Sequence, residues 1–237
     1  MNITLIQCGH IPDNLQYICG DFADIFHRFF SKYEPKIQLD VYDATLGELP
    51  AEKVETDGFL FSGSAHSAYE NKKWILHLKS FIREMYRQRR KMVGICFGHQ
   101  IIAESLGGNV KRSSKGWGVG VQSVDITKQT SWMIPAVMTC NVLVSYQDQI
   151  ETLPPGAMVL GSNSHCRHFM YAIEDLVLGI QGHPEAEKTF AAALYNFRIE
   201  QIGPESVKKA LDSLEKTVDH AIWAKWITNF LSSPDKK

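Results

Sequence analysis

The sequence of 237 residues lacks the features that would place it in a specialised class of protein. No apolar run approaches the ~20 residues that a membrane-spanning helix needs. The formal net charge is only −1, which gives no electrostatic reason to expect a nucleic acid or an anionic membrane as partner. The N-terminus has no basic region followed by a long apolar stretch, so it does not resemble a secretory signal. These absences favour a globular protein with neither nucleic acid nor membrane as partner.

A disulfide framework is also absent. The chain has five cysteines, an odd number without the regular spacing of a disulfide scaffold. This usage is typical of a reducing compartment, and we expect a cytoplasmic protein. Most of these cysteines lie in no reactive motif and are expected to be buried structural thiols: Cys8, Cys19, Cys140 and Cys166. Cys96 is different and is treated below.

The first half of the chain alternates between short apolar segments and helical patterns. The segments that read as strands are bounded by turn residues and cover 3–8, 37–42, 57–61 and 92–96. Apolar residues recur at helical spacing over 21–30 and 74–85. Strands separated by helices predict an α/β fold with an open, mostly parallel central sheet and helices on both faces.

The second half changes character. Strand-like segments joined by short turns cover 118–126, 136–144, 157–161, 169–173 and 176–181. They predict a mixed or antiparallel extension of the same sheet, not a second domain. Helical patterns return over 186–201 and 206–231, and the last six residues are expected to fray. We therefore expect a domain over residues 1–203 and a helical tail, 204–237, packed on it.

Cys96 lies in the segment Gly94-Ile95-Cys96-Phe97-Gly98, directly after an apolar strand and before a helical pattern. A reactive side chain on such a sharp strand-to-helix turn needs neighbouring glycines, because Cβ atoms would crowd the turn. The N-terminus of the following helix and a neighbouring imidazole would both favour the thiolate form of Cys96. The arrangement predicts a cysteine nucleophile.

His183-Pro184-Glu185 supplies the expected partners of Cys96. His183 is the candidate general base, and Glu185 is the candidate acceptor for the proton on its other ring nitrogen. Two residues apart in an extended segment, the two side chains lie on the same side. Such a tripeptide alone is weak evidence, but together with the cysteine turn it predicts an acyl-transfer enzyme or hydrolase.

Attack of a thiolate on a carbonyl creates an oxyanion, which needs hydrogen-bond donors. The backbone N–H of Phe97, the residue after the nucleophile, is the natural first donor. A second is expected from Gly63, in the small-residue segment Ser62-Gly63-Ser64 that follows a strand. Because ligands collect at the carboxyl ends of parallel strands, Gly63, Cys96 and His183 are expected at one edge of the sheet.

The cluster His165-Cys166-Arg167-His168 invites a metal interpretation. No second ligand pair at zinc-like spacing accompanies it, so a hydrogen-bonded or solvated loop is the favoured interpretation. We expect no metal and no cofactor.

In combination, these motifs resemble the class I (triad-type) glutamine amidotransferases. The resemblance covers about residues 1–200 and extends to the amidotransferase domain of GMP synthetase and to stand-alone γ-glutamyl peptidases. It implies the fold of that family, a flavodoxin-like α/β sheet, over residues 1–203. It implies that Cys96 forms a γ-glutamyl thioester, with His183 shuttling protons and Glu185 orienting His183. It further implies that the glutamyl head group contacts Gln100 and, in the segment 145–148, the residues Ser145, Tyr146 and Asp148.

Two segments depart from the family pattern. GMP synthetase domains usually carry Ser-His-Gly-Asp where this chain has Ser145-Tyr146-Gln147-Asp148. Many members carry Ser-Gly-Gly-Pro where this chain has Ser62-Gly63-Ser64-Ala65. Both differences concern the choice of acyl donor and leave the hydrolytic chemistry intact.

The resemblance leaves three functions open. The first is a stand-alone amidotransferase-like hydrolase acting on glutamine or a related small γ-glutamyl compound. The second is a γ-glutamyl peptidase that cleaves glutathione-like isopeptides. The third is a glutaminase subunit whose synthase is on another chain, since about fifty residues after Glu185 leave no room for a synthase domain. A non-catalytic relative kept as an interaction module is disfavoured, because it would have no reason to retain Cys96, His183 and Glu185.

Overall fold

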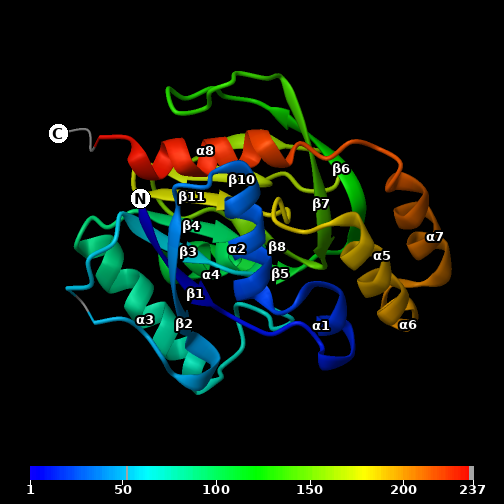
Figure 1. Cartoon of the computed structure of the whole chain (residues 1–237), viewed down its shortest axis with the longest axis horizontal. Helices are drawn as coiled ribbons and strands as arrows, with labels where there is room; N and C mark the ends of the chain where they lie inside the picture. The colour runs from blue at the N-terminus through cyan, green and yellow to red at the C-terminus, as the bar shows by residue number, and fades with distance from the viewer. Residues whose placement is uncertain (52, 235–237) are drawn as a thin grey trace.

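The computed structural model describes residues 1–51 and 53–234. In this part of the chain, nine strands form one mixed sheet in the order β2-β1-β3-β4-β11-β10-β9-β6-β7 (Figure 1). The strands from β2 to β11 in this order run parallel to one another. Their bounds are β1 (Asn2–Gln7), β2 (Gln38–Asp43), β3 (Gly58–Phe61), β4 (Met92–Ile95) and β11 (Val177–Ile180). All five segments agree closely with strands expected from the sequence. The segment at β11 was expected in the extension, but it pairs parallel with β4 and antiparallel with β10, so it joins the two parts of the sheet.

The remaining strands continue the sheet in antiparallel fashion. They are β6 (Gly118–Ile126), β7 (Thr139–Tyr146), β9 (Ala157–Ser162) and β10 (Met170–Ile173). The predicted α/β fold, with a mostly parallel central sheet and an antiparallel extension, is confirmed.

A small second sheet pairs β5 (Asn109–Arg112) with β8 (Asp148–Thr152) and was not expected from the sequence. Both strands are mainly polar, so neither shows an apolar alternation. Only Val110 and Ile150, which face each other in the register, are buried, and both belong to the core cluster that contains helix α4 (Phe97–Ser105). The short elements α1 (Asp13–Cys19) and η1 (Ala44–Leu46) were missed as well, since each buries only one residue.

Helices cover both faces of the sheet. On one face lie α2 (Phe22–Tyr33) and α8 (His220–Ser232), and on the other lie α3 (Lys73–Arg87) and α4 (Phe97–Ser105). Helix α2 begins with a capping box in which Asp21 and Asp24 satisfy each other's backbone N–H groups. Its aromatic stripe packs in the same core cluster as Trp223 and Trp226 of α8, which are fully buried.

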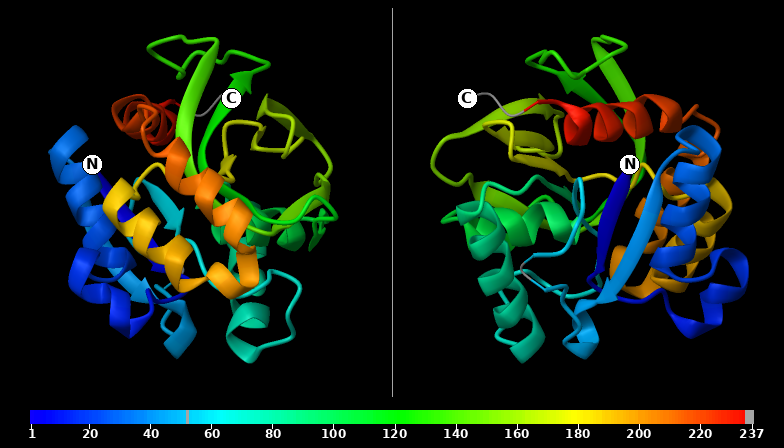
Figure 2. Two further views of the ribbon diagram at one scale, coloured as in Figure 1. Left: turned by 90° about the vertical axis from the view of Figure 1, so that its right-hand side faces the viewer. Right: turned by 60° about the vertical axis from the view of Figure 1, so that its left-hand side comes forward.

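The segment expected to be one helix over 186–201 contains α5 (Lys188–Phe197) and α6 (Ile199–Ile202). The chain leaves helical geometry at Arg198, which ends one helix and begins the other. The tail likewise contains two helices, α7 (Pro204–Ser213) and α8, and Pro204 begins α7 at the position where its missing N–H costs nothing. Figure 2 shows α5, α6 and α7 together beside the antiparallel strands.

The division of the chain at residue 203 into a domain and a tail stays a prediction, and residues 235–237, which were expected to fray, lie outside the described residues. Across residues 1–51 and 53–234, no helix combines the length and apolar character required to cross a bilayer.

Candidate active site

Three loops meet at the carboxyl edge of the parallel strands. Strand β4 lies between β3 and β11 in the sheet, so the segments that follow these strands are neighbours. The backbone joins them directly: Cys96 N–H donates to the Ile180 carbonyl (2.8 Å), and Gly98 N–H donates to the Ser62 carbonyl (3.1 Å). The sheet thus brings together the three segments that the sequence placed at this edge.

Cys96 occupies a strained turn between β4 and α4. Its φ of 54° and ψ of −102° lie in a region that residues with a side chain rarely adopt. The turn is possible because β4 and α4 approach closely: a Cβ on Gly94 would collide with the Gly98 backbone, and a Cβ on Gly98 would collide with the Phe61 carbonyl. Cys96 is only 5% exposed and lies at the N-terminal end of α4.

His183 is fixed from two directions. Its Nδ1 lies 2.7 Å from Glu185 Oε1, and its backbone N–H donates to the Leu143 carbonyl (2.7 Å) of β7. With Nδ1–H donated to the carboxylate, Nε2 is the nitrogen left for proton transfer. Glu185 is itself buried, with a side chain that is 1% exposed.

The charges around His183 favour its protonated form. Burial lowers the pKa of His183, but Cys96 and the Glu185 carboxylate both raise it, and the net result is a pKa well above the ordinary value. An imidazolium next to a thiolate is the charge state that an activated cysteine nucleophile requires. The residues predicted as nucleophile, base and orienting carboxylate therefore lie together.

The two expected oxyanion donors also lie at this edge. Phe97 is the first residue of α4, where backbone N–H groups have no partner within the helix. The N–H of Gly63 has no hydrogen-bond partner in the described part of the chain. A Cβ on Gly63 would lie 2.8 Å from His183 Cε1, so glycine at this position lets the imidazole approach the backbone.

Gln181 was missed by the sequence analysis. Its Nε2 lies 3.7 Å from Cys96 Sγ, and its Oε1 accepts from Gln100 Nε2 (3.0 Å). Gln100 also donates to the Asp148 carbonyl (2.7 Å), so its amide protons are used within the protein and Oε1 is what it can offer a ligand. The signal was a glutamine in an otherwise apolar buried strand segment, two residues before His183.

A pocket of about 410 Å³ opens beside Cys96. The residues predicted to bind the glutamyl head group all line it. The other lining residues come from the segments before α1, after β3 and before β6, and from α4, α5 and α6. The full lining is Pro12, Ser64, Ala65, His66, Ser67, Cys96, Phe97, Gln100, Trp117, Ser145, Tyr146, Gln147, Asp148, Phe197, Arg198 and Gln201. The geometry thus gathers Gln100, Ser145, Tyr146 and Asp148 at one pocket with Cys96.

These four residues differ in how free their side chains are to bind a ligand. Tyr146 is 3% exposed, and its hydroxyl donates to Gln122 Oε1 (3.3 Å). Burial raises the pKa of Tyr146, which therefore stays a neutral phenol. Asp148 Oδ1 accepts from the Tyr69 hydroxyl (3.3 Å) and Ser145 Oγ accepts from Arg198 (3.1 Å), so both are partly exposed polar groups with one protein partner.

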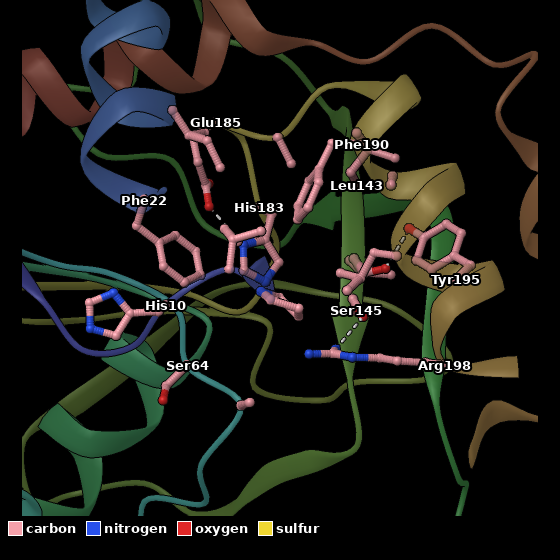
Figure 3. Close-up of a pocket in the computed structure, with 18 residues that line it drawn as sticks. His10, Phe22, Ser64, Leu143, Ser145, His183, Glu185, Phe190, Tyr195 and Arg198 are labelled. Carbon is pink, nitrogen blue, oxygen red and sulfur yellow. Dashed lines mark hydrogen bonds and ion pairs between the residues drawn. The ribbon is translucent and has the colours of Figure 1, made fainter. Parts of the chain in front are cut away.

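A smaller cavity of about 50 Å³, which shares Ser145 and Arg198 with the Cys96 pocket, is lined by His183 (Figure 3). His183 and Glu185 line it together with mainly apolar side chains, among them Phe22, Leu143 and Phe190. Apolar walls around the ion pair keep water away and strengthen its electrostatic coupling.

The cluster at 165–168 has structural contacts. His99 donates from Nε2 to the His168 carbonyl (2.8 Å), and burial lowers the pKa of His99 to about 3, so its ring is neutral. His168 Nδ1 lies 3.0 Å from the Ile150 carbonyl, which ties the loop to β8. In the chain as described, no group of three or more His, Cys, Asp or Glu side chains could hold a metal ion.

Comparisons with known proteins place these observations in a family. The family model described as glutamine amidotransferase class I matches residues 20–200. Gamma-glutamyl peptidase 3 of Arabidopsis thaliana is 30% identical over 230 residues, covering 91% of this chain and 92% of the relative. A glutamine-hydrolysing GMP synthase subunit from Methanospirillum hungatei is 35% identical over 108 residues, 45% of this chain and 57% of that protein.

Among solved structures, a glutamine amidotransferase from Thermotoga maritima superposes with a TM-score of 0.78 at 18% identity, over 98% of this chain and 99% of the other. This likeness shows the fold, and the family match covers most of the sequence. The chain therefore belongs to the class I glutamine amidotransferases and is an enzyme of that class.

Proposed function

We propose that the protein is a cysteine hydrolase that cleaves the γ-glutamyl amide bond of a small γ-glutamyl compound. The observation that carries this proposal is Cys96 in its strained turn, beside an imidazole whose protonated form it stabilises, at the wall of a pocket. Membership of the class I glutamine amidotransferases supports γ-glutamyl as the acyl group.

In the first half of the reaction, the Cys96 thiolate attacks the γ-carbonyl carbon of the substrate. The resulting oxyanion accepts hydrogen bonds from the N–H groups of Phe97 and Gly63. The His183 imidazolium donates its proton to the leaving nitrogen, the C–N bond breaks, and a γ-glutamyl thioester remains on Cys96.

In the second half, neutral His183 removes a proton from water, and the hydroxide attacks the thioester carbonyl. The C–S bond breaks, glutamate leaves, and the thiolate and imidazolium are restored. Glu185 holds Nδ1–H throughout, so that Nε2 stays directed at the reacting atoms. The chemistry requires no cofactor.

Among the three functions left open by the sequence, we favour the γ-glutamyl peptidase. Proteins named gamma-glutamyl peptidase match this chain over about nine-tenths of its length, whereas the GMP synthase subunit matches less than half. A glutaminase that delivers ammonia to a synthase on another chain is the alternative. The cytoplasm remains the proposed location.

The test is release of glutamate from glutamine and, separately, from γ-glutamyl dipeptides and glutathione. We expect dipeptide hydrolysis by the wild-type protein and its loss in Cys96→Ala by a factor of about 10⁴ or more. Cys19→Ala, which removes a thiol outside the pocket, is the matched control and should keep wild-type rates.

Three other results would contradict the proposal or part of it. Glutamine as the preferred substrate would favour the glutaminase that serves a synthase on another chain. Absence of release from every substrate would refute the stand-alone hydrolase. Activity that survives Cys96→Ala would refute the mechanism.

A further inference from the structure

Arg198 carries a charge in the Cys96 pocket that the reaction above does not use. It lies at the junction of α5 and α6 and lines both the 410 Å³ pocket and the small cavity behind His183. Its Nη1 donates to Ser145 Oγ (3.1 Å), and its guanidinium lies over the Trp117 ring, 5.8 Å from the centroid. Figure 3 shows the side chain reaching across the pocket wall toward Ser145.

The guanidinium lacks a carboxylate partner. In the described part of the chain Arg198 forms no ion pair, although it is partly buried. Burial lowers its pKa, and the groups that oppose this effect are Cys96 and Tyr195. An arginine nevertheless stays protonated, and a charge held partly away from water without a carboxylate partner is costly. A site of this kind is completed by an anion from outside the chain.

The surroundings keep the remaining donors of Arg198 in place. The Trp117 ring lies under the guanidinium, and Ser145 accepts a hydrogen bond from one of its nitrogens, so two contacts restrict its movement. A guanidinium oriented in this way matches the two oxygens of a carboxylate better than a flexible ammonium would.

Arg198 and its partner Ser145 lie close to His183, the residue that protonates the leaving nitrogen in the proposed reaction. Ser145, its partner, is two residues from Leu143, which bridges to His183. Arg198 and Ser145 share the small cavity with His183 and Glu185, whereas Gln100 and Asp148 line only the Cys96 pocket. Because His183 delivers the proton to the leaving nitrogen, we assign the Ser145 and Arg198 side of the pocket to the leaving group and the Gln100 and Asp148 side to the head group. This assignment replaces the expectation that Ser145 contacts the head group.

We propose that Arg198 binds the carboxylate of the leaving group, so that the substrate is a γ-glutamyl peptide with a free C-terminal carboxylate. This inference rests on the proposed function and deepens it, since it names the part of the substrate that separates a peptide from glutamine. Ammonia, the leaving group of glutamine, carries nothing for Arg198 to bind.

Two substrates test the contact between Arg198 and the carboxylate of the leaving group. γ-Glutamylglycine and γ-glutamylglycinamide share the head group and the scissile bond and differ only in the charge at the far end. We expect kcat/KM of the wild-type protein to favour the acid over the amide by about tenfold or more. Arg198→Met should bring the ratio close to one, and Arg198→Lys should restore part of it. Arg83→Met, the same change at an exposed position of α3, should keep the wild-type ratio.

An acid-to-amide ratio of kcat/KM near one in the wild-type protein would overturn the assignment of Arg198. So would a wild-type ratio that is retained in Arg198→Met. In either case, hydrolysis of both substrates would still support the proposed function. An equal loss on acid, amide and glutamine would place Arg198 at the head-group carboxylate instead, which also overturns it.

Titration calorimetry with Cys96→Ala gives a reading that does not depend on turnover. The acid should bind about tenfold more tightly than the amide, and the added Arg198→Met change should remove the difference. If no substrate is hydrolysed, the proposed function fails. Tighter binding of the acid would then still support a carboxylate site at Arg198, and equal binding would overturn it.

Discussion

The parallel and antiparallel halves of the sheet contribute different things to the site. The parallel half carries Cys96, Gly63 and His183 on adjacent strand ends, where backbone segments are in direct contact. The antiparallel half and the helices beside it contribute Ser145 and Arg198, which reach the pocket through their side chains.

The two regions differ in how well they tolerate a change in side-chain size. Near Cys96, the close approach of β4 and α4 leaves no room for an added methyl group. At the pocket wall, partly exposed side chains can change size without moving the backbone. We expect changes in the parallel half to reduce kcat and changes in the antiparallel half to alter KM and substrate choice.

Gly94→Ala should have the largest effect. The new Cβ would collide with the backbone of Gly98 and His99, so α4 must move away from β4 and Cys96 must leave its turn. We expect the free energy of unfolding to fall by about 3 kcal/mol and kcat/KM for γ-glutamylglycine to fall by about 10³-fold. Chemical denaturation and steady-state kinetics measure the two effects.

The control for this change is Gly116→Ala. Gly116 has a φ of +72° with open space around its Cβ position, so only backbone strain of about 1 kcal/mol applies. Comparable losses for both variants would show that the close approach at the turn is unimportant.

Gly63→Ala tests the contact between the backbone and His183. Its Cβ would lie 2.8 Å from His183 Cε1, and the imidazole must shift to relieve the contact. A misplaced base slows proton transfer, so we expect kcat to fall about 10²-fold with a smaller change in KM. A variant that retains the wild-type kcat would contradict the placement of His183 against this glycine.

Glu185→Gln tests the electrostatic coupling of the ion pair. The carboxylate raises the pKa of His183, so its loss lowers that pKa and His183 loses its proton at lower pH. The protonated imidazole is required for leaving-group departure, so the alkaline limb of the kcat/KM profile should move to lower pH. We expect kcat to fall about tenfold to 10²-fold near neutral pH.

Glu187→Gln, an exposed neighbour at the start of α5, should keep the wild-type pH profile. If the alkaline limb is unchanged in Glu185→Gln, Glu185 does not raise the pKa of the catalytic imidazole.

Ser145→Ala should have the smallest effect. It removes the hydroxyl that holds the Arg198 guanidinium, a single hydrogen bond at a partly exposed site. We expect KM for γ-glutamylglycine to rise about fivefold and to change more than kcat. The control is Ser123→Ala on β6, which is exposed in the same half of the sheet. A fall in kcat with an unchanged KM would contradict this expectation and show that Ser145 acts in the chemical step.

The sequence was most informative where function depends on local geometry. The glycines around Cys96 predicted the strand-to-helix turn because the close approach of two elements adjacent in sequence demands small residues. The strands of the central sheet were readable because burial on both faces leaves a continuous apolar run. By contrast, β5 and β8 were missed, because a polar pair of strands buries only Val110 and Ile150.

The sequence by itself determined the family, the parallel sheet and the residues expected to react, because each of these follows from patterns within short segments. Only the tertiary structure brought Gln181 to Cys96 and Arg198 to Ser145, since these contacts join segments 85 and 53 residues apart. Such contacts depend on strand order and on where α5 ends, which no local pattern specifies. The fold thereby placed the charge of Arg198 at the Cys96 pocket, and the substrate that we propose depends on this placement.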